Sequence, residues 1–105
     1  CNGNLCKKEI KFNSQKEGSD LWLFSKTANL KNNLNKMSVI LTPSFEGNVW
    51  YEKNNSKNIL TIFAKPKNRL KNSDVSYRFT APRFDSEKWP NARQDYETKG
   101  FVIND

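Results

Sequence analysis

Alternation of apolar and polar residues is the feature that most limits how this chain can fold. It is clearest in residues 74–80, where Val75, Tyr77 and Phe79 are separated by single polar residues. Residues two apart share one face of a β-strand, so the pattern predicts a strand with one buried and one solvated face. No segment shows a convincing long helical stripe of apolar residues at three- and four-residue spacing.

The same reasoning predicts about seven strands, separated by turn residues at roughly eight- to twelve-residue intervals. Residues 20–27 contain four apolar residues in a row and are expected to form a strand covered on both faces. Residues 28–36 are rich in Asn, a poor helix former, so we expect a loop there with one helical turn at most. The predicted strands are residues 8–13, 20–27, 37–42, 49–53, 58–65, 74–80 and 96–103.

This pattern predicts an all-β fold, either a small antiparallel β-sandwich or a partly closed barrel. The length of 105 residues fits one domain,. We expect residues 8–105 to form that domain and residues 1–7 to be an N-terminal tether. No apolar run approaches the roughly 20 residues that a membrane-spanning helix needs.

The two cysteines, Cys1 and Cys6, bear on the compartment. A mature bacterial lipoprotein begins with a cysteine whose sulfur carries a diacylglyceryl group, so Cys1 is the expected lipid anchor. The alternative is a Cys1–Cys6 disulfide that closes a small loop. Either arrangement suits an oxidising compartment. We therefore expect the bacterial cell envelope, on the periplasmic face of the outer membrane, or secretion.

The chain carries 18 Lys and Arg against 11 Asp and Glu, a formal charge of +7. Four of the cations alternate with other residues, so an extended chain would place all four on one side. We consider this ribbon a candidate docking surface for an acidic partner. The competing interpretation is a solvated loop in a lysine-rich protein. The four cations are Lys65, Lys67, Arg69 and Lys71.

Tryptophans provide the other candidate contacts. Trp89 lies in a polar segment between Pro82 and Pro90, with Arg93 shortly after it. Trp and Arg are favoured at interface hot spots, so Trp89 and Arg93 are candidate partner-binding residues. The alternative is that Trp89 anchors its loop to the core.

A second aromatic group is formed by the adjacent Trp50 and Tyr51, together with Trp22. On strands, such residues are expected to be core residues or cross-strand pairs. A ligand platform is the alternative for this group.

Catalytic chemistry has little support. The chain contains no His, so it has no imidazole base, and no phosphate-binding or nucleophile-elbow motif occurs,. The two cysteines lack the spacing and the additional ligands of a zinc site. Several carboxylates occur along the chain, but sequence alone does not bring two of them together. We therefore predict no enzyme activity, no catalytic residues, no metal and no cofactor.

These observations favour a non-catalytic binding or assembly module: a small envelope lipoprotein that holds a partner protein. By analogy of class only, such a module resembles a pilotin or a subunit of a secretion or conjugation machine. It would use either strand-edge pairing or a patch of aromatic and basic residues. One alternative is an OB-like nucleic-acid-binding domain, which the positive charge and aromatic strands fit. Another is a secreted inhibitor or immunity-type protein.

Overall fold

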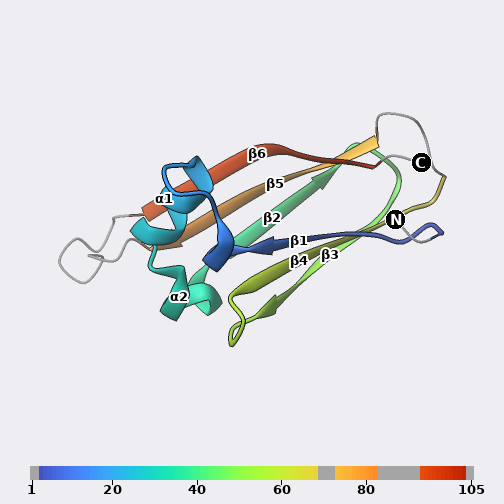
Figure 1. Cartoon of the computed structure of the whole chain (residues 1–105). Helices are drawn as coiled ribbons and strands as arrows, with labels where there is room; N and C mark the ends of the chain where they lie inside the picture. Colours follow the sequence, from blue (N-terminus) through green and yellow to red (C-terminus); the bar gives the residue numbers. More distant parts are fainter. Residues whose placement is uncertain (1–2, 69–72, 83–92, 104–105) are drawn as a thin grey trace.

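Two antiparallel three-stranded sheets form the body of the protein (Figure 1). A computed structural model describes residues 3–68, 73–82 and 93–103, the last of these for the backbone alone. One sheet has the strand order β1-β4-β3 and the other β2-β5-β6. The strands are β1 (Cys6–Lys11), β2 (Ser38–Pro43), β3 (Gly47–Asn54), β4 (Ile59–Pro66), β5 (Ser73–Pro82) and β6 (Arg93–Ile103).

The predicted β-rich fold with antiparallel sheets is confirmed, but two details of the prediction are wrong. The described residues contain six strands rather than about seven. The two sheets remain separate, so the alternative of a partly closed barrel does not apply. Strand β1 begins at Cys6, two residues before the predicted boundary at Lys8.

The missing strand is the one expected at residues 20–27, which form helix α1 (Asp20–Thr27) instead. The Ser19 side chain accepts a hydrogen bond from the backbone N–H of Trp22 at 3.2 Å and caps the helix,. Asp20 in the first turn and Lys26 in the last turn match the helix dipole,. A short apolar run fits a buried strand and a helix equally well, and here the cap decides.

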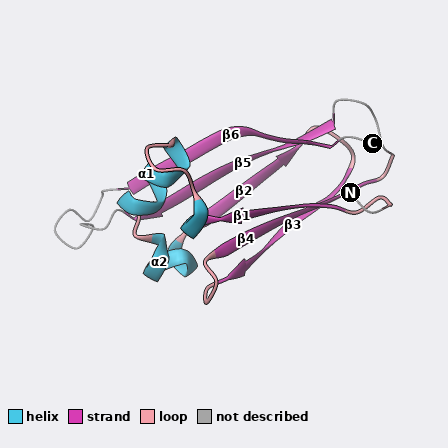
Figure 2. Ribbon diagram, in the orientation of Figure 1, coloured by secondary structure: helices cyan, strands magenta, loops and turns pink. Residues whose placement is uncertain are grey.

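Short helices cover one end of the two sheets (Figure 2). They are η1 (Phe12–Ser14), α1, α2 (Leu30–Asn33) and η2 (Leu34–Lys36). The prediction of a loop with at most one helical turn at residues 28–36 is wrong, because α2 and η2 together make residues 30–36 helical. Leu30 and Leu34 turn inward and are buried, so these turns form an apolar lid over the core. None of the helices in the described residues has the length and apolarity that crossing a bilayer requires.

Phe79 on β5 joins the sheets to this helical end. Its side chain is fully buried, and its ring lies 6.1 Å from that of Phe12 and 6.1 Å from that of Phe24. The Tyr77 ring stacks on the Phe79 ring at 5.1 Å. The alternation in residues 74–80 thus points Val75, Tyr77 and Phe79 into the core, as the sequence predicts.

Cys6 is the buried start of β1 and is disulfide-bonded. Cys1 is the other cysteine of the sequence and lies outside the described residues. A sulfur in a disulfide cannot also carry a thioether-linked lipid. Lipidation of Cys1 and a Cys1–Cys6 bond are therefore mutually exclusive states of the chain.

A buried Asn58 ties the β3–β4 hairpin to the helices. Its backbone is left-handed, with φ of 58°, and only 3% of its surface is exposed. The side-chain Nδ2 donates to the carbonyl of Leu30 at 2.6 Å, and its own carbonyl accepts from the N–H of Phe12 at 3.1 Å. One residue thus fastens α2, η1 and the hairpin together.

Substituting Asn58 separates its two contributions. Asn58→Gly keeps the left-handed backbone but leaves the Leu30 carbonyl without its donor, which we expect to cost about 1–3 kcal/mol. Asn58→Ala adds about 1–2 kcal/mol, because a Cβ is unfavourable in that conformation. The unfolding free energy from urea titration measures both. Equal losses in the two variants would mean that the backbone conformation at this position contributes nothing.

Candidate functional site

The outer face of the β1-β4-β3 sheet gathers the candidate contact residues. Strand β4 alternates strictly, and its inward side chains Leu60, Ile62 and Ala64 are buried. Its other side chains face solvent, and the strand register places a residue of β1 and one of β3 beside each. The resulting rows lie about 6.6 Å apart along the strands. They are Lys7, Phe63 and Trp50; Glu9, Thr61 and Glu52; and Lys11, Ile59 and Asn54.

The first row contains an exposed aromatic stack. The rings of Trp50 and Phe63 lie 5.3 Å apart with their planes 10° from parallel, and Trp50 is 38% exposed. Lys7 lies on the other side of Phe63, and Lys65 is the next outward residue along β4. We call Lys7, Trp50, Phe63 and Lys65 the basic-aromatic patch. An exposed indole on the same face as two cations can contact a partner.

Of the predicted aromatic group, Trp50 is thus a cross-strand pair, as expected for a strand residue. Tyr51 lies on the opposite face of β3, with Lys53 Nζ 5.9 Å from its ring. Trp22 lies on α1 and not on a strand. The group therefore does not form a single platform.

Of the predicted cationic ribbon, Lys65 and Lys67 lie in the described residues, and the use of the ribbon as a docking surface stays a prediction. Both lysines are exposed on either side of the buried Pro66; Lys65 is on β4, and Lys67 follows the end of that strand. Lys67 pairs with Glu46 at 3.5 Å, an exposed contact of little energetic weight,. Gly47 makes this corner possible, because a Cβ there would lie 2.5 Å from the Lys65 carbonyl oxygen.

The other predicted contact residues cannot be placed at this surface. Cys1, Arg69, Lys71 and Trp89 lie outside the described residues. Arg93 begins β6 opposite Pro82, and only its backbone is described.

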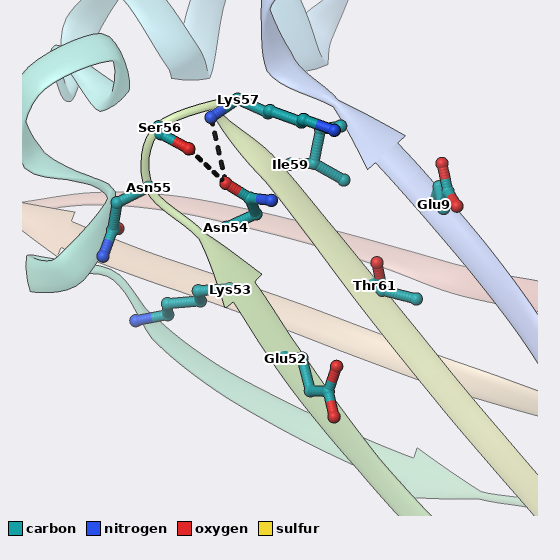
Figure 3. A pocket seen from close by; sticks show the side chains of 9 residues that line it. All are labelled: Glu9, Glu52, Lys53, Asn54, Asn55, Ser56, Lys57, Ile59 and Thr61. Carbon is teal, nitrogen blue, oxygen red and sulfur yellow. Dashed lines mark hydrogen bonds between the residues drawn. The ribbon is translucent and has the colours of Figure 1, made fainter.

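A groove of about 480 Å³ lies on the same face, beside the β3–β4 turn (Figure 3). Glu9 and Glu52 stand on either side of Thr61, one on each strand that flanks β4. Sequence reasoning did not pair these carboxylates, although their positions on outward faces of strands were available. The missing information was the register that sets both opposite Thr61. The groove is lined by Glu9, Glu52, Lys53, Asn54, Asn55, Ser56, Lys57, Ile59 and Thr61.

Three edge strands can be assessed from the direction of their backbone groups. The N–H of Phe12 donates to the Asn58 carbonyl and continues the β1–β4 register. The backbone N–H and C=O groups of even-numbered residues in β1 therefore point towards β4, and those of odd-numbered residues point away from the sheet. The N–H of Ser44 donates to the Asp74 carbonyl, so in β2 the backbone groups of odd-numbered residues point away from β5. The N–H of Lys67 donates to the Glu46 carbonyl, so in β3 the backbone groups of odd-numbered residues point away from β4. Each strand thus has backbone groups open to pairing.

Each of these edges also carries a residue that discourages pairing. On β1, Lys8 lies between the inward residues Cys6 and Ile10 and yet remains exposed. On β3, the ammonium of the inward Lys53 donates a hydrogen bond to the carbonyl of Met37, the residue before β2. Pro43 on β2 has no N–H to offer. Inward charges and proline are standard means of blocking a sheet edge.

Burial lowers the pKa of Lys53 below its ordinary value of 10.5,.

Among the described residues, no three His, Cys, Asp or Glu side chains converge as metal ligands would. No family model, no curated protein and no solved structure matches the chain.

Replacing Lys53 with Met should remove a pH dependence of stability. The folded protein holds the Lys53 proton less tightly than the unfolded chain does, so the burial penalty is fully present below the lowered pKa,. It is relieved as the pH rises from that value towards 10.5, and wild-type stability therefore gains on the variant across this window. Urea unfolding of both proteins over a pH series gives the difference. A difference that stays constant with pH contradicts this assignment.

Replacing Lys8 with Val should unblock the β1 edge and promote association between chains. The change restores an uninterrupted apolar inner row beside open backbone groups. Lys7→Val is the matched control, because it adds the same side chain on the outer face of the same strand. Light scattering at increasing concentration should show larger species for Lys8→Val than for the control. Equal behaviour would indicate that general hydrophobicity, and not the edge, governs association.

Proposed function

We propose that this chain is a non-catalytic binding module that holds a protein partner at its basic-aromatic patch. The observation that carries the proposal is the Trp50–Phe63 stack, in which Trp50 is open to solvent and Phe63 has Lys7 and Lys65 as neighbours on the same face. Aromatic residues that become desolvated at a contact supply much of the binding energy. The lysines favour a partner with an acidic surface and speed its approach. That partner is either a subunit of an assembly or an enzyme that the module blocks.

Contact through the face of the sheet fits better than strand addition. Lys8, Pro43 and Lys53 obstruct the three edges whose side chains are described,. The outer face carries no such obstruction. Of the two modes that the sequence suggests, the aromatic and basic patch is therefore the one we propose.

A nucleic-acid ligand is the second candidate, because bases can stack on an exposed indole beside lysines. The carboxylates of Glu9 and Glu52 lie one row from the stack and would repel phosphates. A protein partner with mixed charge is compatible with both groups. We therefore rank the protein partner first.

The proposed setting is the bacterial cell envelope or the outside of the cell. The disulfide at Cys6 supports an oxidising compartment,. Anchoring through Cys1 would require the reduced, lipidated form in place of that disulfide. The intact mass of the natural protein distinguishes the two, since lipid adds mass and the disulfide removes two hydrogens.

Photo-cross-linking from the patch tests the function. A photoreactive phenylalanine derivative in place of Phe63, introduced in the native cell, should join the module to one protein. Lys7→Glu with Lys65→Glu should reduce that product about tenfold, as expected for two reversed charges at a contact. Lys16→Glu with Lys36→Glu is the matched control at the helical end and should leave the product unchanged.

Three outcomes decide against the proposal. The first is the absence of a cross-linked protein, and the second is a product that both lysine pairs affect equally. The third is a salt-sensitive shift of labelled single-stranded DNA that Lys7→Glu abolishes, which would favour the nucleic-acid alternative.

A further inference from the structure

The polar groups in the groove beside Thr61 are uncommitted. The carboxylates of Glu9 and Glu52 and the ammonium of Lys57 have no ion-pair or hydrogen-bond partner among the described residues. All three residues are exposed, and Figure 3 shows the two carboxylates on either side of Thr61. The groove therefore offers acceptors and a donor that a ligand can use without breaking an internal contact.

The β3–β4 turn forms one wall of the groove and is already ordered before any ligand binds. Asn54 Oδ1 accepts hydrogen bonds from Ser56 Oγ at 2.9 Å and from the Lys57 backbone N–H at 3.0 Å. These bonds fix the turn and leave Asn54 Nδ2 as a further donor. At the other end of the turn, Asn58 is anchored in the core. A ligand would therefore meet an ordered wall and would not have to order it.

The floor of the groove is less polar than its walls. Ile59 and Thr61 of β4 are half-buried and present a methyl-bearing surface, with Thr61 between the two carboxylates and Ile59 in the adjacent row. In the next row along β4, Phe63 and Trp50 continue this surface as a stacked pair. A ligand with one apolar face and a polar rim would match both the floor and the walls.

The charges of the lining narrow the class of ligand. Lys53 directs its ammonium to the Met37 carbonyl, which leaves Lys57 as the other lysine of the lining, and Lys11 lies beside Ile59 in the same outer row. Two carboxylates and two ammonium groups balance in charge, so the groove favours an ion of neither sign. The remaining lining groups are amides and hydroxyls that both donate and accept. A neutral molecule with many hydroxyls satisfies such a lining best.

We propose that this groove binds a neutral saccharide. The apolar face of one sugar ring lies over Ile59 and Thr61, and its hydroxyls donate to Glu9 and Glu52. Lys57 and Asn54 Nδ2 donate to oxygens of the sugar. The inference goes beyond the proposed function, and its residues are separate from the basic-aromatic patch.

The groove binds the saccharide and does not cleave it. Glycoside hydrolysis by two carboxyl groups requires one of them to be kept protonated, usually by burial. Glu9 and Glu52 are both exposed to solvent. The described groove contains nothing that encloses either group.

Titration with defined trisaccharides tests the inference. Cellotriose and N-acetylated chitotriose are the neutral probes, and the glucosamine trimer is the cationic one. At least one neutral probe should bind with a dissociation constant of about 1 mM or tighter by calorimetry. The same probe should shift the backbone amide resonances of Glu52, Asn54 and Thr61.

Variants show where the probe binds. Glu52→Ala and Lys57→Met should each weaken binding about tenfold, because each removes a charged hydrogen-bonding group. Glu17→Ala removes an exposed carboxylate elsewhere and should leave the affinity unchanged. Lys65→Glu alters the patch two rows away from the carboxylates, so retained sugar binding in that variant separates this inference from the proposed function.

The opposite results are equally clear. Binding of neither neutral trisaccharide overturns the inference, and so does binding of the glucosamine trimer alone, which would reflect simple attraction to carboxylates. Release of shorter sugars during incubation would show cleavage and contradict a pure binding site. Equal affinity in Glu52→Ala and wild type would place the sugar elsewhere on the molecule.

Discussion

The arrangement of the whole molecule depends on how the two sheets are held to the helical end. Phe79 provides the apolar part of that junction, since the rings of Phe12 and Phe24 pack around it. Asn58 provides the polar part by satisfying a carbonyl of α2 and an N–H of η1. A buried amide in a left-handed turn fixes position more narrowly than apolar packing does, because its bonds have direction. The hairpin is therefore set at one angle to the helices, and the outer face is set with it.

This placement separates the uses of the sheet surfaces. The inner rows are committed to the core, and Lys8, Pro43 and Lys53 obstruct the three edges described with side chains,. An inward lysine costs stability, as the lowered pKa of Lys53 indicates,. The outer face of β1-β4-β3 remains for recognition. It carries Lys7, Phe63 and Trp50 in one row and Glu9, Thr61 and Glu52 in the next.

Sequence reasoning succeeded where a single strand carries the information. The alternation in residues 74–80 identified the buried face of β5. It failed where another level decides. A capping serine made residues 20–27 a helix, although their apolar run also fits a strand,. The Glu9–Thr61–Glu52 row depends on register between distant strands, which no local pattern contains.

The β3–β4 turn has one further consequence. Asn54 at its start shapes the groove, and Asn58 just beyond it is bonded to the first residue of α2. The turn thus connects the open groove to α2, which has only four residues and so little stability of its own,. A contact that restricts the motion of the turn also restricts the motion of α2. A molecule resting on the sheet would slow the opening of a helix that it never touches, and this slower opening would be visible as delayed exchange of the amide hydrogens of α2.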